Sequence, residues 1–373
     1  MQHKSYRISD YFQQRPSAAE AKPGVLVTLV HTEGSCYQKA GAQLYLTGNQ
    51  DVYGLISGGC LEHDIIQQAK EVQFSQKPRL AFFDTGDPLD LDFGYGLGCG
   101  GKLWVFLEAI FHDDELADKM ICRTRESHAE AIIIEAEQSD IIGRRFSLSK
   151  SKAVEDQEAN EVLFDLQRCL TSQKLSQIKE YTAQQYFKVA LIHRSAQPVL
   201  TIFGCGLGSW PLAAMAHTLG WDIQAFDHRQ AYLQDLPSQL HGAQLLDWQR
   251  PEIFHAQPAR PSAAVIMTHN FQADRRILAQ ILRHPWPYIG LLGSKARSEH
   301  LLAEFISDHP DREKSLLNLH APIGLDLGGT SPEAIALAIV SEIQAVWNQR
   351  SHIKARSAIS LPPKERAYVR TYS

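Results

Sequence analysis

The sequence lacks a long hydrophobic segment and an excess of charge of either sign. No apolar run among its 373 residues reaches the ~18–20 residues that a membrane-spanning helix needs. The polar segment Met1 to Arg15 has no apolar core of a secretory signal. The formal net charge of −5 gives no general attraction to nucleic acid or to anionic membranes. We therefore expect a soluble, cytoplasmic protein with no nucleic-acid or membrane partner.

Cysteine is scarce, and none of the six cysteines forms a Cys-x-x-Cys pair. The absence of that spacing argues against a structural zinc site, and a reducing cytosol would keep the thiols free. Three cysteines nevertheless lie in glycine-rich segments, where a packed, inert cysteine is not the usual choice: Cys60, Cys99 and Cys205. The remaining three are interpreted as structural: Cys36, Cys122 and Cys169.

The chain length predicts about two domains, and internal repeats and low-complexity tracts are lacking as well. We expect an N-terminal domain over residues 1–195 and a C-terminal domain over residues 196–350, joined by a linker at Ser195 to Pro198. Residues 351–373 form a basic, proline-containing tail that is expected to be loosely held.

The first domain is predicted to be a mixed α/β domain. Short β-branched and apolar runs predict strands at Val25–Val30, Leu44–Leu46, Val52–Ile56, Arg79–Asp84 and Leu103–Ala109. A helical pattern covers Leu61 to about Val72. The patterns between Phe111 and Gln197 are weaker, and there we expect only a strand at Ala131–Ile134 and a helix at Glu161–Leu170.

The second domain alternates strands and helices, which predicts a Rossmann-like, doubly wound parallel sheet. The expected strands are Val199–Phe203, Asp222–Phe226, Ala263–Met267, Tyr288–Leu292 and Ile323–Leu327. A helix is expected after the first, third, fourth and fifth of them. The last helix, Pro332–Trp347, has a natural N-cap in Ser331.

The carboxyl ends of these strands carry glycine-rich or polar residues, and in open α/β sheets the ligand binds at that edge. Gly204, Gly206 and Gly208 follow the first strand as part of a dinucleotide-type fingerprint, although Ser209 replaces its third glycine. Asp227, about 20 residues further on, stands where a ribose-binding acid is expected. The alternative interpretation is a tight strand-to-helix turn without a ligand.

Other strand ends supply further candidates. Gly293, Ser294 and Lys295, with Arg297, could form an anion cradle at a helix start, or simply a solvated helix terminus. His269 could contact a ligand or act as a base, or it could cap the next helix. Asp326 ends the last predicted strand, whereas Asp274 is predicted to lie on a helix surface or to cap that helix.

Two cysteines of the first domain are candidate cofactor and metal ligands. Cys60 follows Ser57-Gly58-Gly59 at a predicted helix start, where the helix dipole favours a thiolate. Cys99 has four glycines around it in the segment Gly96 to Gly101. Thiolates are soft metal ligands and sulfur nucleophiles, so both cysteines could contact a metal or its sulfido ligand. The alternative for each is a small residue packed in a tight turn.

Seven segments, taken in order, resemble the XdhC/CoxI family. The N-terminal matches are Gly34 to Ala42, Ser57 to Glu62 and Gly98 to Gly101. The C-terminal matches are Phe203 to Gly206, Met267 to Asn270, Tyr288 to Lys295 and Pro322 to Gly329. One departure is the sequence after Gly206, where the family commonly has His-Val-Gly and this chain has Leu207-Gly208-Ser209.

The resemblance implies an accessory chaperone for the molybdenum cofactor (molybdopterin) rather than an enzyme. Such a protein binds the cofactor, cooperates with a cysteine desulfurase in its sulfuration, and inserts it into the apo form of a xanthine-dehydrogenase-type molybdenum hydroxylase. The glycine loop and Lys295 would suit the cofactor phosphates. We further hypothesise that Cys60 and Cys99 lie near the metal or its sulfido ligand. A homodimer is expected because family members often associate.

Two other functions remain open at the level of the sequence. An NAD(P)-dependent oxidoreductase would explain the glycine loop and Asp227, but not the cysteine-containing loops of the first domain. A scaffold that joins the desulfurase to the apoenzyme without holding a cofactor would tolerate changes at Gly204 or Gly206.

Overall fold

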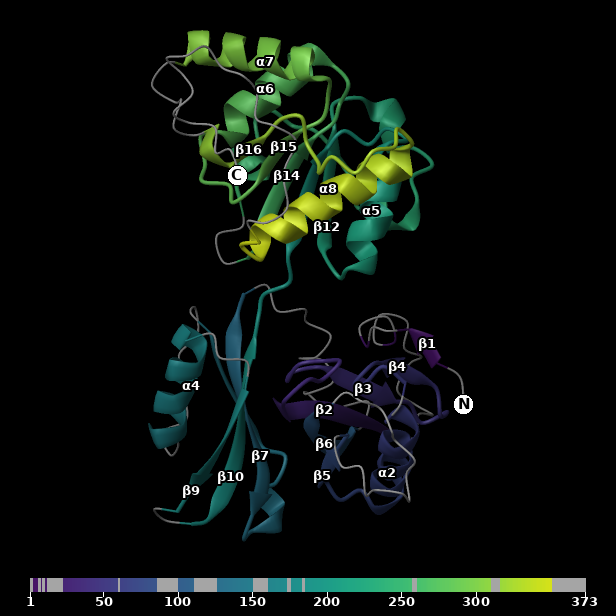
Figure 1. Ribbon diagram of the computed structural model, residues 1–373, viewed down its shortest axis with the longest axis vertical. Coiled ribbons are helices and arrows are strands. Elements are labelled where there is room, and N and C mark those ends of the chain that lie inside the picture. Colours follow the sequence, from purple (N-terminus) through teal and green to yellow (C-terminus); the bar gives the residue numbers. More distant parts are fainter. Residues whose placement is uncertain are drawn as a thin grey trace. The chain divides into compact units, whose positions relative to one another are not determined.

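In a computed structural model, the chain folds as two units, Met1–Ala196 and Gln197–Ser373 (Figure 1). The described residues are 3–5, 8, 11, 23–59, 61–85, 100–110, 126–149, 160–172, 176–182, 185–256, 260–309 and 316–350. The predicted tail, residues 351–373, lies outside this set.

In the described part of the first unit, the chain forms two sheets, two α-helices and one short 3-10 helix. Sheet A has the strand order β1-β4-β3-β2-β6-β5, and sheet B is antiparallel with the order β8-β7-β10-β9. The elements of sheet A are β1 (His3–Ser5), β2 (Gly24–Glu33), β3 (Gln43–Leu46), β4 (Val52–Gly54), β5 (Arg79–Asp84) and β6 (Lys102–Ile110). Sheet B comprises β7 (His128–Ala136), β8 (Arg145–Ser149), β9 (Ser176–Tyr181) and β10 (Phe187–Arg194). The helices are α2 (Glu62–Ser75), α4 (Asn160–Ser172) and the short η2 (Ser139–Ile141).

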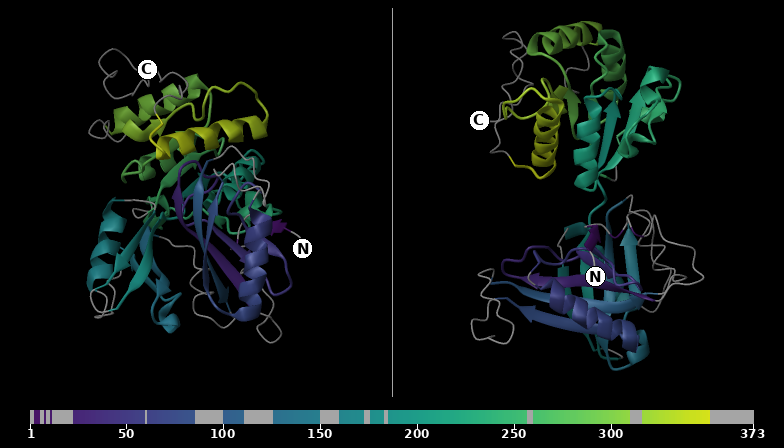
Figure 2. Two further views of the ribbon diagram at one scale, coloured as in Figure 1. Left: turned by 60° about the horizontal axis from the view of Figure 1, so that its bottom comes forward. Right: turned by 90° about the vertical axis from the view of Figure 1, so that its right-hand side faces the viewer.

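These elements form four layers, in the order α2, sheet A, sheet B and α4. Val25, Val27 and Leu29 of β2 pack with α2, whereas residues of the opposite face of sheet A pack with sheet B. Ile132 and Ile134 of β7 contribute to that cluster between the sheets, while their neighbours on the strand pack against α4. Because consecutive strand residues point to opposite faces, each central strand serves two cores. Figure 2 (left) shows both sheets between the blue α2 and the teal α4.

A buried ion-pair network ties the two sheets together. Arg145 on β8 pairs with Glu108 of sheet A and with Glu130 of sheet B, the latter at 2.6 Å between Nη1 and Oε1. Arg194 donates from Nε to the other oxygen of Glu130 at 2.7 Å and from Nη1 to the Gly41 carbonyl at 2.9 Å. Burial alone would raise the pKa of Glu130, but the two arginines outweigh it and lower that pKa to about 2.

The second unit is built on a parallel sheet with the order β13-β12-β11-β14-β15-β16, which is the Rossmann order. The predicted doubly wound fold is therefore confirmed. Its strands are β11 (Val199–Phe203), β12 (Asp222–Asp227), β13 (Gln244–Leu245), β14 (Ser262–Ile266), β15 (Ile289–Leu291) and β16 (Leu319–His320). Its helices are α5 (Ser209–Thr218), α6 (Phe271–Ile281), α7 (Lys295–Asp308), α8 (Pro332–Trp347), η3 (Gln230–Leu233), η4 (Ser238–Leu240) and η5 (Pro251–Phe254).

Helices cover both faces of this sheet (Figure 1). Leu200 and Ile202 of β11 pack with α5 and α8 on one face, whereas Phe203 packs with α6 and α7 on the other. The apolar runs of β11 and β14 are buried on both sides, as expected for central parallel strands. The strand order reverses between β11 and β14, and this switch point is where a doubly wound sheet opens a crevice.

One predicted strand of this unit is wrong. Residues Ile323 to Leu327 form a loop, and the edge strand is the shorter β16 that precedes it. Pro322 has no N–H to donate to a ladder, and Gly324 adopts a φ of 95°. The Gly324 N–H donates instead to the carboxylate of Glu342 on α8 at 2.9 Å. The predicted N-cap is confirmed, since the Ser331 side chain accepts from the Ala334 N–H.

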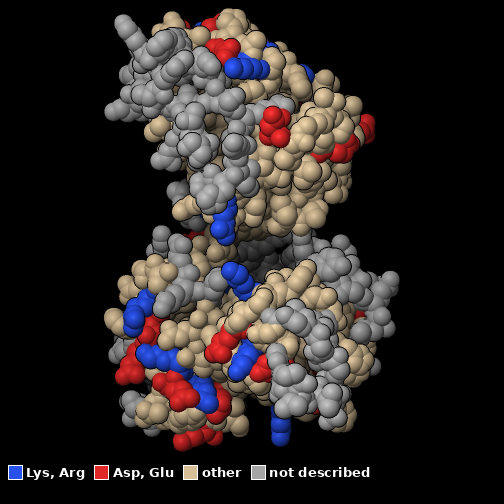
Figure 3. All heavy atoms as spheres, viewed as in Figure 1, with Lys and Arg blue, Asp and Glu red and all other residues tan. Residues whose placement is uncertain are grey.

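Charged side chains are spread unevenly over the face of the molecule in Figure 3. Over sheet B, basic and acidic groups alternate, as in the contacts of Lys188 with Glu135 and Glu180. The surface over α5 and α8 is largely uncharged on that face. Within the described part of the chain, no helix combines the length and the apolar character needed to cross a bilayer.

Candidate functional site

Gly204, directly after β11, is required by the fold itself. Its φ is 119°, and a Cβ there would lie 2.5 Å from the Met267 carbonyl oxygen at the end of β14. The backbones of the two strands at the switch point therefore approach too closely for any side chain. Glycine is therefore needed at position 204 for the packing of the two strands, independently of any ligand.

Gly206 and Gly208 have no comparable structural reason to be glycine. Neither has a positive φ, and a Cβ at Gly206 would meet only the Tyr232 ring, at 3.4 Å. A Cβ at Gly208 would make an ordinary contact with Met267, at 3.7 Å. Gly208 is also the N-cap of α5 and provides no side-chain cap for the helix. Glycine at such positions allows a ligand to approach the backbone and the helix N-terminus.

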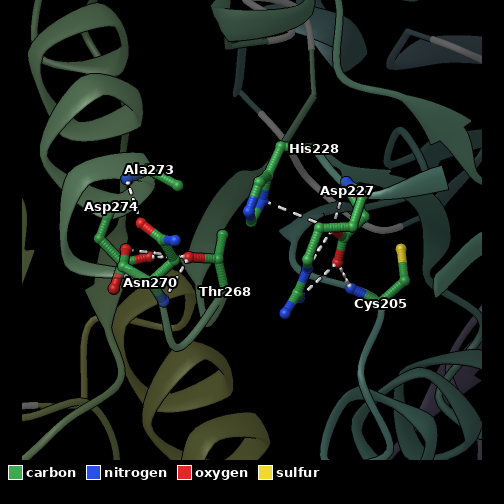
Figure 4. Close-up of polar contacts among 8 residues, drawn as sticks. Cys205, Asp227, His228, Thr268, Asn270, Ala273 and Asp274 are labelled. Atoms are coloured by element: carbon green, nitrogen blue, oxygen red, sulfur yellow. Dashed lines mark hydrogen bonds and ion pairs between the residues drawn. The ribbon is translucent and has the colours of Figure 1, made fainter. Parts of the chain in front are cut away.

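Asp227 lies at the end of β12 with both carboxylate oxygens engaged (Figure 4). Oδ2 accepts from the Cys205 N–H at 2.8 Å and from Arg229 Nη2 at 3.0 Å, while Oδ1 accepts from the N–H and Nε of Arg229, both at 2.9 Å. Burial would raise the pKa of Asp227, but these hydrogen bonds lower it below the usual value. The Arg229 guanidinium lies 3.6 Å over the ring of Tyr232. A ribose would have to displace Arg229 to reach this acid.

Cys205, in the middle of the glycine loop, is a buried thiol. Only 2% of its surface is exposed, and burial, helped by the Asp227 carboxylate, raises the pKa of the thiol to about 12. The side chain is therefore protonated at neutral pH and is neither a nucleophile nor a ready metal ligand. Cys205 packs in the cluster beneath α5 and α8.

The end of β14 carries a polar cluster that links two helices. Thr268 donates from Oγ1 to Asp274 at 2.6 Å, and Asn270 caps α6 by accepting from the Ala273 N–H at 2.9 Å (Figure 4). The prediction for Asp274 is wrong, because its side chain is fully buried rather than on the helix surface. It accepts from Nη2 of Arg297 on α7 at 2.7 Å. The residue types were visible in the sequence, but the contacts join α6 to the end of β14 and to α7.

The predicted anion cradle at the start of α7 is only partly assembled. Ser294 is the N-cap, and its hydroxyl accepts from the Arg297 N–H. Lys295 is exposed. Gly293 leaves space that the Arg297 side chain uses, since a Cβ there would lie 3.0 Å from its Cδ. Arg297 is thus the cation of this group with a fixed position, held by Asp274.

A cavity of about 390 Å³ opens beside this arginine. Leu292, Ile323, Leu325 and Ile335 supply apolar walls, and Arg297 supplies the charged one. The remaining lining residues are His269, Gly293, Pro322, Gly328, Gly329, Ala334 and Ala338. The structure therefore brings His269, Gly293 and Arg297 together on one cavity, while exposed Asp326 lies in the loop that borders it.

His269 holds an unusual backbone conformation at this cavity. Its φ is 59°, in the left-handed region that residues other than glycine seldom adopt, and the residue is exposed. The helix cap comes from the following residue, Asn270, so the alternative role of His269 as the cap is not realised. Strained backbone of this kind clusters at functional sites.

A buried network joins α8 to the loop that lines the cavity, and the sequence does not predict it. Glu342 on α8 accepts from the Tyr288 hydroxyl at 2.5 Å and pairs with His320 on β16 at 3.3 Å. Together with the Gly324 contact, it fixes the loop after β16 against α8. The helical pattern of α8 marks position 342 as inward-facing, but it does not name the three partners.

In the first unit, three glycine-containing segments converge at one end of sheet A. A Cβ at Gly34 would lie 2.6 Å from the Gly100 carbonyl oxygen, and one at Gly101 would lie 2.6 Å from the Cys36 sulfur. A Cβ at Gly58, in the third segment, would lie 3.3 Å from the ring of Tyr37, which is 70% exposed. The Cys36 thiol donates to backbone carbonyls, which agrees with its structural interpretation.

Glu62 fixes the turn that precedes α2. Its carboxylate accepts from the N–H groups of Ser57 at 2.6 Å and of Gly59 at 2.9 Å, and also from the Ser57 hydroxyl. The two predicted sulfur ligands, Cys60 and Cys99, lie outside the described residues. Among the residues that are described, no cluster of three or more His, Cys, Asp or Glu side chains could hold a metal ion.

Comparison with known proteins adds two family matches. The model of the XdhC and CoxI family matches residues 17–84, and that of the XdhC Rossmann domain matches residues 200–343. A Bacillus subtilis protein, named as a probable subunit of xanthine dehydrogenase, is 30% identical over 327 residues, which make up 87% of this chain and 93% of the relative.

Two further relatives span nearly the whole chain. The molybdenum cofactor insertion chaperone PaoD of Escherichia coli is 24% identical over 343 residues, covering 92% of this chain and 87% of PaoD. The crystal structure of a xanthine dehydrogenase from Bacillus halodurans matches with a TM-score of 0.64 and 24% identity, over 95% of this chain and 97% of that one. This structural match shows the same fold.

Proposed function

Because the chain belongs to the XdhC and CoxI family, we propose that it is an accessory protein of a xanthine-dehydrogenase-type molybdenum hydroxylase. In this role it binds the molybdenum cofactor and inserts it into the apo-hydroxylase. The name of PaoD, a molybdenum cofactor insertion chaperone, supports this role, as does the name of the Bacillus subtilis relative. Such a role does not require the protein to turn over a substrate.

The observation that carries the proposal is the pair of glycines that the fold does not need. Gly206 and Gly208 lie at the switch point, at the start of a helix without a side-chain cap. A phosphate or pyrophosphate can approach such a loop closely, and the helix N-terminus favours its negative charge. The molybdenum cofactor carries a phosphate, or a pyrophosphate in its dinucleotide form, so the residues present fit this group.

The arrangement around Asp227 favours this cofactor over NAD(H). An NAD-binding Rossmann domain uses the acid at this position to accept from a ribose. Here the carboxylate already accepts four hydrogen bonds from Cys205 and Arg229. Gly204, Asp227, Gly293, Ser294, Lys295 and Asp326 are proposed to frame the cofactor site as strand-end groups.

We also propose that two cysteines of the first unit take part in the sulfuration of the cofactor. Cys60 and Cys99 would lie near the molybdenum or its sulfido ligand while a cysteine desulfurase delivers sulfur. The segments next to these cysteines in the sequence, Ser57–Gly59 and Gly100–Gly101, belong to the convergent loops of the first unit. We also propose that the protein acts as a homodimer, and sedimentation of the purified protein would test this.

Anaerobic gel filtration tests cofactor binding. The purified protein is mixed with molybdenum cofactor released from a molybdoenzyme, and the protein peak is assayed for molybdenum and for oxidised pterin fluorescence. We expect co-elution by the wild type and loss of co-elution by Gly206→Val, which fills the space left for the phosphate. Gly242→Val is the matched control, because its Cβ would enter open space elsewhere in the same unit.

Two results would contradict the proposal. If the cofactor fails to co-elute while NAD(H) or NADP(H) binds tightly, the result favours the oxidoreductase alternative, which hydride transfer to a carbonyl would then test. If neither ligand binds and the protein still joins the desulfurase to the apo-hydroxylase, it is a scaffold. Binding that is equal in Gly206→Val and Gly242→Val would remove the glycine loop from the site.

A further inference from the structure

The cavity beside Arg297 has the size and the chemistry of a ligand pocket. Its volume of about 390 Å³ falls in the range of small-molecule sites, roughly 300–1,000 Å³. Leu292, Ile323 and Ile335 offer apolar surface to a ring, and one guanidinium offers charge and directional donors. Few polar groups on an apolar wall are typical of pockets that orient one ligand.

The guanidinium is held in place before any ligand arrives. Asp274, fully buried, accepts from Arg297 Nη2 at 2.7 Å and is itself fixed by the Thr268 hydroxyl at 2.6 Å. The centroid of the Phe271 ring lies 5.4 Å from the guanidinium carbon of Arg297. An arginine fixed in this way loses little conformational entropy when its remaining N–H groups bind an anion.

The position of the cavity in the sheet suggests which part of a ligand it holds. The Gly206 and Gly208 loop follows β11, whereas the cavity borders the ends of β14 and β15 and the loop after β16. In a Rossmann sheet the phosphates lie at the switch point, and the two halves of the ligand extend to either side. His269, with its left-handed backbone, stands at the end of β14, between the glycine loop and the rest of the cavity.

We propose that this cavity binds a planar heterocycle that carries an anionic group, with Arg297 as the binding cation and Asp274 as its positioning residue. Within the proposed function, on which the identity of the ring depends, the heterocycle is the pyranopterin of the molybdenum cofactor and the anionic group is the dithiolene that its pyran ring carries. The cavity and the Asp274–Arg297 ion pair do not depend on that function, because both are present in the structure.

The test uses two metal-free pterins and the full-length protein. Carboxypterin is a fluorescent planar ring with a carboxylate, and methylpterin is its neutral counterpart. Binding of each is measured by fluorescence anisotropy. We expect Arg297→Met to weaken carboxypterin binding by about tenfold or more, the usual value of a charge-assisted hydrogen bond. Methylpterin binding should change much less.

Matched variants separate recognition from stability. Arg275→Met removes another α6–α7 ion pair, with Asp308 and Glu304, that does not border the cavity, so it should leave binding unchanged. Asp274→Asn should weaken carboxypterin binding but not methylpterin binding, because it releases Arg297 without closing the cavity. Arg297→Lys keeps the charge and should give an intermediate affinity.

The outcomes distinguish this inference from the proposed function. If Arg297→Met and Arg275→Met bind carboxypterin equally, or the wild type binds neither pterin, the cavity assignment is overturned even where the intact cofactor co-elutes. If Arg297 governs carboxypterin binding but the intact cofactor never co-elutes, the pocket stands and the proposed function fails.

Discussion

The Cys205 thiol shows how the surroundings of a single residue decide its chemistry. A cysteine in a glycine loop at a helix start suggests a reactive thiolate, yet burial and the Asp227 carboxylate raise its pKa to about 12. We expect iodoacetamide to leave Cys205 unlabelled in the native protein at pH 8 and to label it in urea, as read by peptide mass spectrometry. Rapid labelling of the native protein would contradict the buried position.

The buried Glu130 carboxylate should make the stability of the protein depend on pH. Its pKa falls from 4.5 in a model peptide to about 2 in the fold, so its contribution is present above pH 4.5 and is lost as the pH falls toward 2. Glu130→Gln should lower the free energy of unfolding at pH 7 by about 3 kcal/mol, because Arg145 and Arg194 stay buried without their partner.

Urea unfolding as a function of pH checks this expectation. The deficit of Glu130→Gln should narrow below pH 4.5, whereas Glu252→Gln, at an exposed ion pair with Arg250, should stay close to the wild type throughout. A deficit of the same size at all pH values would mean that the ion pairs are not its cause.

For single residues, the sequence predicts where polar side chains occur in the elements, but not which residues they contact. The place of Asp274 in the first turn of α6 predicts a surface acid, because most such acids only complement the helix dipole. Its burial depends on Thr268 and Arg297, which arrive from other elements. The position of Asp227 likewise predicts an acid at a strand end, but not the arginine two residues later that covers it.

At the scale of elements, the glycine loop after β11 separates structural from ligand-binding roles. Gly204→Ala places a Cβ against the Met267 carbonyl at a φ of 119°, and it should cost about 2 kcal/mol or more of unfolding free energy. Gly206→Ala should leave stability within about 0.5 kcal/mol of the wild type. Chemical denaturation of the two variants makes the comparison. Equal destabilisation would mean that both glycines serve the turn.

The elements found from the sequence are those whose pattern is local. β11 and α8 follow the predicted bounds because a continuous apolar run and a capped helical pattern can each be recognised from consecutive residues. β9 and β10 are not predicted, since their alternation becomes meaningful only when sheet B packs between sheet A and α4. The loop at Ile323–Leu327 resembles a strand because three of its residues are large and apolar, but two of these, Ile323 and Leu325, line a cavity instead.

At the scale of the whole molecule, the two units carry separate cores. The clusters around Val27, Ile133 and Ile192 lie in the first unit, and those around Phe203 and Leu200 lie in the second. We expect calorimetry to resolve two transitions, with Glu130→Gln lowering one midpoint and Gly204→Ala lowering the other. A single transition shifted by both variants would show that the units unfold together.

Transfer of the cofactor tests the central claim most directly. The protein, loaded anaerobically with molybdenum cofactor, is mixed with the apo form of a xanthine-dehydrogenase-type hydroxylase, and the appearance of hydroxylase activity is followed with free cofactor as the reference. We expect the loaded wild type to activate the hydroxylase faster than free cofactor does, and Gly206→Val to give no advantage. Activation at the same rate with or without the protein would contradict the chaperone role.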